Sequence, residues 1–126
     1  MTNARSEKPV VLRVADELVV ESAESGEQLR ELLRAGRHRI VLDMRHTTYI
    51  SGIGLGLVAD GAKQARRGGG DVKLVVSRPE VRRLFDLGEL GSMLEFYDDV
   101  ESACGAFGES VGRVERTMLL RQFDDD

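Results

Sequence analysis

The chain has 126 residues, 41% of them hydrophobic and 32% charged, with 22 acidic against 18 basic side chains and a net charge of -4. This length favours one domain whose core needs no disulfide or metal, and the composition is typical of a soluble globular protein. No apolar run approaches the roughly 20 residues of a membrane span, and residues 1–8 are too polar for a signal peptide. The acidic balance gives no electrostatic reason to bind nucleic acid.

Residue types that often perform catalysis or bind metals are scarce. Cys104 is the single cysteine, which fits a reducing cytoplasm, and its small neighbours indicate packing within a helix. His38 and His46 have no Cys or acidic residue at a metal-ligand spacing, and we interpret His38 as a solvated residue near the start of a strand. His46 could act as a general base, but a loop position accounts for it more simply. We therefore expect no catalytic residue, no metal site and no cofactor.

The pattern of apolar residues, taken in chain order, predicts alternating strands and helices. Residues 1–8 are expected to be a disordered tail, and residues 10–20 a β-hairpin or a bent strand with a tight turn at Asp16 and Glu17. Helical spacing of apolar residues predicts helices over 25–36, over 55–67 and from 77 through 85, followed by a last helix from 98 through 107. Short apolar runs predict strands over 40–42, 72–76 and 93–97. This alternation is that of an α/β fold.

Two predictions concern the C-terminal third of the chain. Asp98 and Glu101 have the spacing of a capping box, so the last helix is expected to begin at Asp98. Val111, Val114 and Met118 recur at helical spacing. Residues 108–126 are therefore expected to form a C-terminal extension with a short extra helix up to Phe123 and a frayed acidic end.

The most unusual stretch is 50–58, where Gly52, Gly54 and Gly56 lead into a helix. Glycines at such a junction can cradle a phosphate, permit a sharp turn with close helix packing, or present a docking surface. The dinucleotide fingerprint does not fit, because its third glycine would fall at Leu57, and the P-loop does not fit because no lysine follows the glycines. In the third interpretation, the docking surface, Ser51 and the apolar Ile53 and Leu55 are exposed at the positively polarised end of a helix. A phosphate group added to this surface would change the binding of a partner.

Five segments of the chain carry a family resemblance when they are taken in order. They are Asp16-Glu17-Leu18, Ile40-Val41-Leu42-Asp43, Tyr49-Ile50 with Gly54-Leu55-Gly56, the segment 69–75 and the segment 79–90. Together they resemble the STAS family, the domain shared by anti-sigma factor antagonists and sulphate transporters. Asp16-Glu17-Leu18 stands where the family usually has Gly-Glu-Leu. Ile40-Val41-Leu42-Asp43, then Tyr49-Ile50 and Gly54-Leu55-Gly56, is similar to the pattern V-V-L-D-L, F-I-D-S-S-G-L-G. Gly69-Gly70-Asp71-Val72-Lys73-Leu74-Val75 is similar to G-G-x-L-x-L-V, and Pro79-Glu80-Val81-Arg82-Arg83-Leu84-Phe85 with Leu87 and Leu90 to P-x-V-R-R-x-F/L-x-x-x-G-L.

This resemblance implies an α/β domain over residues 9–107, with a mixed sheet of about five strands flanked by about four helices. In bacterial members it implies partner switching. The unmodified antagonist binds an anti-sigma factor, commonly a serine kinase, and phosphorylation of a serine that follows the conserved aspartate breaks the complex.

The chain departs from the family at the position of this switch. When Gly54-Leu55-Gly56 is aligned with the family's G-L-G, Ser51 stands at the aspartate, Gly52 at the phosphorylated serine and Ile53 at the second serine. Gly52 has no side chain to modify, so the usual phosphoacceptor is lost, and Ser51 is the candidate substitute. Ile53 makes the surface more apolar than in the family.

We therefore interpret the chain as a cytoplasmic, non-enzymatic protein of the anti-sigma factor antagonist type that binds an anti-sigma factor. Alternatives are a STAS subunit of a transport or scaffold complex, and a nucleotide-binding STAS domain. We expect neither nucleic acid binding nor membrane insertion, and a homodimer stays open. The residues expected to contact the partner are Tyr49, Ser51, Gly52, Ile53, Gly54, Leu55 and Gly56.

Overall fold

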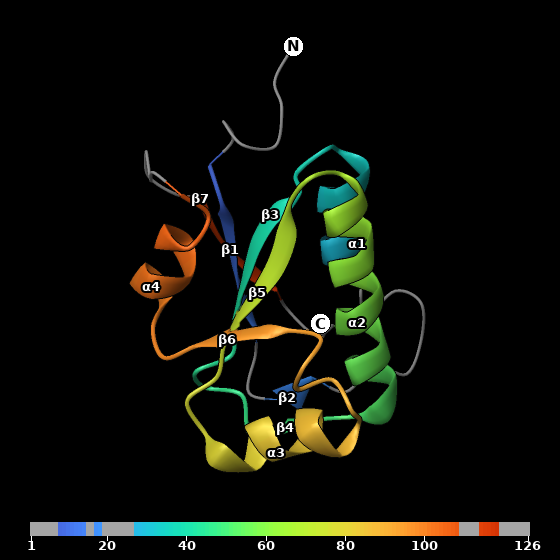
Figure 1. Cartoon of the computed structure of the whole chain (residues 1–126), viewed down its shortest axis with the longest axis vertical. Coiled ribbons are helices and arrows are strands. Elements are labelled where there is room, and N and C mark those ends of the chain that lie inside the picture. Colours follow the sequence, from blue (N-terminus) through green and yellow to red (C-terminus); the bar gives the residue numbers. More distant parts are fainter. Residues whose placement is uncertain (1–7, 15–16, 19–26, 109–113, 119–126) are drawn as a thin grey trace, which may run out of the picture.

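The computed structural model describes residues 8–14, 17–18, 27–108 and 114–118, and it describes residues 17–18 and 114–118 by their backbone alone. Strands and helices alternate along most of the chain (Figure 1). In chain order they are β1 (Val10–Val14), β2 (Glu17–Leu18), α1 (Glu27–Arg34), β3 (Arg39–Asp43), β4 (Tyr49–Ile50), α2 (Gly52–Arg67), β5 (Asp71–Val75), α3 (Pro79–Leu87), β6 (Glu95–Tyr97), α4 (Val100–Gly105) and β7 (Val114–Met118).

The main sheet has five strands in the order β6-β5-β3-β1-β7. Each neighbouring pair is parallel, and Ile40 of the central strand β3 lies between Val10 of β1 and Val72 of β5. Parallel strands in such a position are covered on both faces, which explains their near-continuous apolar runs. The expected α/β class, five-stranded sheet and four flanking helices are confirmed, but the described strand pairs are all parallel and the sheet is not mixed.

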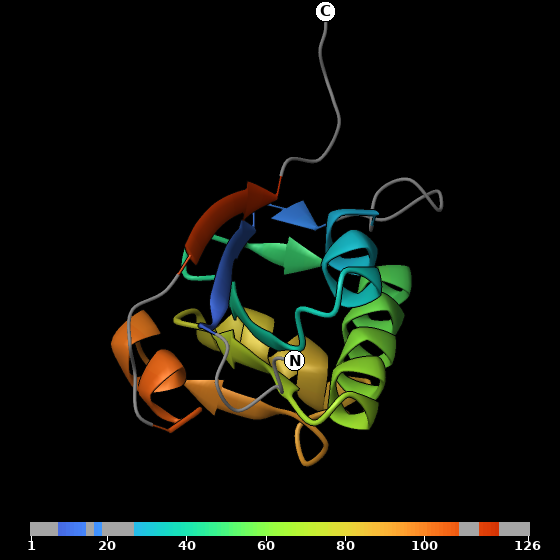
Figure 2. The ribbon, with the colours of Figure 1, turned by 90° about the horizontal axis from the view of Figure 1, so that it is seen from above.

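Helices cover the two faces of the sheet unequally (Figures 1 and 2). Helices α1, α2 and α3 contribute to the larger apolar core, where they pack on residues such as Leu12 and Leu42. Helix α4 lies on the other face, against Val11, Val41 and Val75. Successive strand residues point to opposite faces, so β1 and β3 supply both cores.

A two-stranded sheet lies at one end of the domain, together with α3 and the N-terminal end of α2 (lower part of Figure 1). In it Glu17 and Leu18 of β2 pair in parallel with Tyr49 and Ile50 of β4. The expected hairpin is therefore wrong, because β2 pairs with a strand about thirty residues further along the chain and not with β1. The predicted turn residue Asp16 lies outside the described residues.

Two predictions for the C-terminal third are also wrong. The extra helix is contradicted by β7, which pairs in parallel with β1 and so extends the main sheet. The predicted acidic end and residues 119–123 lie outside the described part, as does most of the predicted N-terminal tail.

Helix α4 begins one residue later than the predicted cap, because Asp99 is its N-cap and accepts a hydrogen bond from the Ser102 N–H at 2.7 Å. This position places Val100, Ala103 and Cys104 against the sheet.

The turn between α2 and β5 is shaped by its contact with His38. A Cβ atom at Gly70 would collide with the His38 backbone carbonyl, and one at Gly68 would collide with the His38 ring. The same carbonyl accepts a hydrogen bond from the Asp71 N–H at 2.8 Å, so the backbone of β5 starts in direct contact with the segment before β3. Glycine is therefore required at Gly70 for close approach of two backbones. We expected His38 to be solvated, but this contact leaves it half-buried.

Candidate functional site

The glycine-rich segment forms the junction between β4 and α2, with Ser51 as the N-cap. Ser51 has an extended backbone (φ -78°, ψ 167°), and its Oγ accepts a hydrogen bond from the Gly54 N–H at 3.0 Å. Its carbonyl accepts the Leu55 N–H at 2.8 Å, which is the first helical hydrogen bond. Serine is among the preferred N-cap residues because its oxygen satisfies an N–H that has no partner within the helix. The predicted candidate phosphoacceptor therefore has a structural role in starting α2.

The junction exposes apolar side chains beside glycines. Ile53 is 64% exposed and Tyr49 is 46% exposed. Gly52 and Gly56 are also exposed, and a Cβ atom at either would meet no atom within 4 Å. Gly54 is buried, so it shapes the turn and does not belong to the exposed surface. Leu55 is half-buried and packs against the main core, so of the apolar residues expected to contact a partner only Tyr49 and Ile53 face outward to a large extent.

The end of α3 belongs to the same end of the domain. Leu87, its last residue, is 72% exposed, and Tyr49, Ile53 and Leu87 are the large hydrophobic side chains that the described residues expose. A Cβ atom at Gly88 would lie 3.2 Å from Leu55 Cδ1, which shows that the end of α3 is close to the first turn of α2. We call Tyr49, Ile53 and Leu87 the apolar end. Single exposed hydrophobic residues are common, but their concentration at one end marks a candidate binding surface.

Leu87 was not among the residues expected to contact a partner, although a sequence signal for it exists. Val81 and Phe85 form the buried stripe of α3, and positions 84 and 88 continue it at helical spacing. Leu87 falls outside this stripe and is thus an apolar residue on a face turned away from the core. Its proximity to α2 depends on tertiary packing, and no spacing in the sequence indicates it.

An ion pair between the buried Asp43 and the exposed Arg45 anchors the connection that leads to β4. Asp43 has a side chain only 4% exposed, and its two oxygens accept hydrogen bonds from Arg45 Nε and Nη2, both at 2.8 Å. Burial alone would raise the pKa of Asp43, but the hydrogen bonds from the Arg45 guanidinium and backbone N–H outweigh burial and hold the pKa below its ordinary value. The ionised Asp43 therefore fixes the start of the loop that positions Tyr49.

A second group of charged residues lies on the α4 face and is satisfied within itself. Lys73 is buried, and its Nζ lies 2.5 Å from Glu95 Oε1 and 3.5 Å from Asp71 Oδ2. The Tyr97 hydroxyl donates to the same Glu95 oxygen at 2.7 Å. Burial opposes the charge on Lys73, but the hydrogen bond to Glu95 and the nearby carboxylates outweigh it and raise the pKa of Lys73. Because Lys73 has two close carboxylate partners, its burial is compensated, and the ion pair with Glu95 links β5 to β6.

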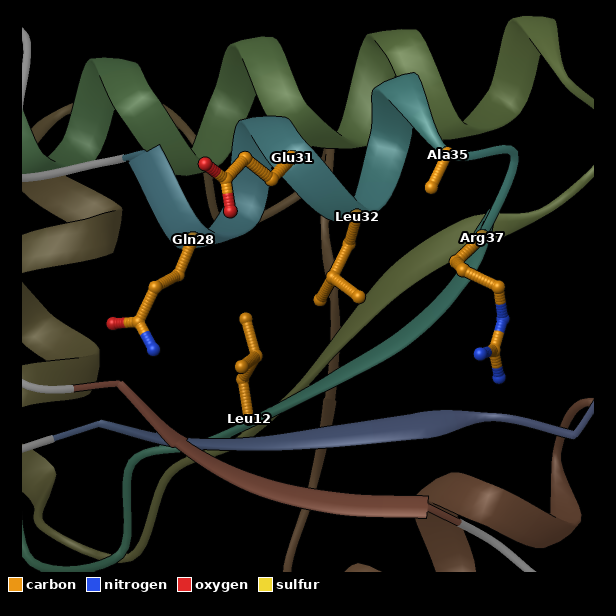
Figure 3. Close-up of a pocket in the computed structure, with 6 residues that line it drawn as sticks. All are labelled: Leu12, Gln28, Glu31, Leu32, Ala35 and Arg37. Atoms are coloured by element: carbon orange, nitrogen blue, oxygen red, sulfur yellow. The ribbon is translucent and has the colours of Figure 1, made fainter.

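A pocket lies between α1 and the sheet (Figure 3). Leu12 of β1 and Leu32 of α1 point toward one another across it, and Gln28, Glu31 and Arg37 surround them. It shares no residue with the junction 49–57. Cys104 is buried in the α4 core, which confirms the expected packing role.

The described residues contain no group of three or more His, Cys, Asp or Glu side chains that could hold a metal ion. Within the same part of the chain, no helix combines the length and apolar character that crossing a membrane requires.

The five-stranded sheet and its helices define a small α/β domain, and comparison with known proteins identifies its family. The model of the STAS domain family matches residues 2–103, so the chain belongs to the STAS domain family. It is 36% identical over 99 residues to BtrV of Bordetella bronchiseptica, a protein named as a proposed anti-sigma factor antagonist. This match covers 75% of the chain and 84% of BtrV.

Two solved structures share the fold. SpoIIAA, an anti-sigma factor antagonist in its unphosphorylated form, superposes with a TM-score of 0.63 at 20% identity, over 80% of this chain and 90% of SpoIIAA. The protein TM1081 of Thermotoga maritima, also named as a proposed anti-sigma factor antagonist, superposes with a TM-score of 0.61 at 21% identity, over 76% of this chain and 91% of TM1081. At these identities the superpositions show the fold alone.

Proposed function

We propose that this chain is a cytoplasmic anti-sigma factor antagonist that binds an anti-sigma factor of the serine-kinase type through the apolar end. Membership of the STAS domain family and the similarity to BtrV support this class of function. The observation that supports the proposal most is the 64% exposure of Ile53, at the junction where we expect the partner contact. Burial of such a side chain in a complementary pocket is a common source of binding energy.

The proposal includes the loss of the usual phosphorylation switch. Gly52 stands where the resemblance places the phosphorylated serine, and it has no hydroxyl to accept phosphate. Ser51 stands at the family's aspartate, and Asp and Ser are both preferred N-cap residues. Its hydrogen bond to Gly54 therefore accounts for serine at this position without any phosphate chemistry. The complex would then be controlled by the amounts of the two proteins and not by modification of the antagonist.

Isothermal titration with purified anti-sigma factor tests the docking surface. Affinity capture from the native cell, followed by mass spectrometry, identifies which serine-kinase anti-sigma factor to purify. We expect I53E to weaken its binding by at least about thirtyfold, the loss typical of a central interface residue. Q64E is the matched control, because it places the same charge on an exposed position of the same helix.

The fold of I53E should be intact, because a glutamate in the first turn of a helix is favoured by the helix dipole. Equal affinities of I53E and the unchanged chain would contradict the proposed surface, and failure of every anti-sigma factor of the cell to bind would contradict the function.

Incubation with the kinase and ATP tests the loss of the switch. We expect no added phosphate on the chain by intact-mass spectrometry. Stoichiometric phosphate at Ser51 would show that the acceptor has moved by one residue and that the switch is retained.

A further inference from the structure

The turn after α3 holds a glutamate in a backbone conformation that favours glycine. Glu89 has φ +63° and is the non-glycine residue with positive φ among the described residues. The Leu90 N–H donates to the Phe85 carbonyl at 2.9 Å, and the Glu89 N–H donates to the Asp86 carbonyl at 3.0 Å. These two bonds are those of a Schellman motif, in which the left-handed position is usually glycine. Here Gly88 precedes that position, and Glu89 occupies it.

Glutamate at this position is unfavourable for the isolated chain in two ways. A side chain with a Cβ is strained in the left-handed conformation, which lowers the folding equilibrium constant by about fivefold or more. A carboxylate just after the C-terminal end of a helix also lies near the negative end of the helix dipole. Both effects act against the stability of α3, so the residue needs a compensating contact.

Contacts within the described part of the chain do not supply that compensation. Glu89 is exposed, and among the described residues its carboxylate has no ion-pair or hydrogen-bond partner. The nearby Asp86, in contrast, has an ion-pair partner, because its Oδ1 lies 3.6 Å from Arg82 Nε. A strained residue that gains no compensating contact from the described residues is a reason to look for a functional contact with a partner.

The position of Glu89 identifies where that contact lies. It follows Leu87 by two residues, and the intervening Gly88 is next to Leu55 of α2. Glu89 is thus a charged residue beside Leu87, and Arg83 and Asp86 of α3 are exposed charged residues near Leu87 as well. Charged residues at the rim of an apolar surface set partner choice and the rate of encounter more than they set affinity.

We propose that Glu89 is a specificity residue of the apolar end, and that the partner places an arginine or lysine opposite Glu89 next to an apolar pocket for Leu87. This inference rests on the proposed function, since it assigns a contact within the same complex. The occupant to which it commits is the basic and apolar surface of the anti-sigma factor. The left-handed backbone at Glu89 lies just after the last residue of α3, and Glu89 is exposed there.

Two substitutions separate binding from stability. E89Q removes the charge and keeps the length of the side chain, and we expect it to weaken binding of the purified anti-sigma factor about three- to tenfold at low ionic strength. This difference should shrink as salt is added, because screening reduces the attraction of exposed charges. E89G removes the charge and the strain together. We expect it to bind as weakly as E89Q while its Tm rises by about 3–5 °C.

E31Q is the control, because it removes one exposed carboxylate from α1 and changes the net charge equally. It should leave the affinity unchanged. If the unchanged chain binds the anti-sigma factor and both Glu89 variants bind equally well, this inference is overturned and the proposed function stands. If E89G does not raise the Tm, the premise of backbone strain is wrong and the inference fails with it. If the unchanged chain does not bind, the proposed function and this inference both fail.

Discussion

The Oγ atom of Ser51 accepts a hydrogen bond from the backbone N–H of Gly54 at 3.0 Å, and this bond begins helix α2. We expect S51A to lower the free energy of unfolding by about 1 kcal/mol, because it leaves a helical N–H without a partner. S51D should retain most of the stability, since aspartate caps helices as well as serine does. Urea unfolding of the three proteins measures both effects. Equal stability of S51A and the unchanged chain would show that the cap contributes nothing.

The open space around Gly52 allows a serine to be placed at the position where the resemblance expects the family's phosphorylated serine. A Cβ atom at Gly52 meets no atom within 4 Å, so we expect G52S to change stability by less than about 0.5 kcal/mol. The partner kinase and ATP should then phosphorylate G52S, and the added charge of about -2 beside Ile53 should break the complex. Intact-mass spectrometry and titration measure the two steps. G52A, which has no hydroxyl, should stay unmodified, and binding of phosphorylated G52S with unchanged affinity would argue against the surface.

Most of the fold could be predicted from local patterns. The run Ile40 to Leu42 lies within β3, and Pro79 is the first residue of α3, as expected of a residue that lacks an N–H. Strand β7 could not be predicted in this way. A spacing of four residues, as between Val114 and Met118, places two side chains on one side of a helix and equally on one side of a strand. The pairing that decides between them is with β1, about a hundred residues earlier.

The candidate site was predictable in part. The glycines and the family resemblance indicated the junction 49–57 as a candidate surface, and Tyr49 and Ile53 are exposed there. Contact of this junction with a partner stays a prediction. Leu87 was missed because its closeness to α2 arises from the packing of α3. The left-handed backbone of Glu89 was not predicted from the sequence. Gly88 stands one residue earlier, and a helix that ends near a glycine normally has that glycine in the left-handed position, whereas here Glu89 occupies it.

The ion pair between the buried Asp43 and the exposed Arg45 predicts a pH dependence of stability. The pKa of Asp43 is lowered in the folded chain, so its contribution is fully present above the ordinary pKa of 3.8 and is lost as the pH falls through the folded value. We expect the free energy of unfolding to decrease below about pH 4. D43N should lack this part of the decrease, and at pH 7 it should be less stable by about 1–2 kcal/mol because Arg45 loses its charged partner.

Urea unfolding of both proteins between pH 2 and pH 7 measures the difference. D60N, a change at an exposed carboxylate of α2, serves as the control and should follow the unchanged chain. Parallel curves for D43N and the unchanged chain would exclude a role of Asp43 in acid unfolding.

Gly56 allows stability and binding to be separated at one position. It lies inside α2, it is exposed, and an added Cβ meets no atom within 4 Å. G56A should therefore raise the free energy of unfolding by about 0.5–1 kcal/mol, because alanine loses less backbone entropy in a helix. Gly61 in the same helix is the contrast, since a Cβ there would lie 2.8 Å from Leu29 Cδ2 and G61A should be destabilising.

If the anti-sigma factor approaches the backbone of α2 at Gly56, G56A should bind it more weakly even though the domain is more stable, and a charged residue there should abolish binding. Thermal unfolding and titration of the same samples measure the two quantities. A domain that is stabilised by G56A and binds with unchanged affinity would show that the partner does not approach the backbone at Gly56 and would confine the contact to the apolar end.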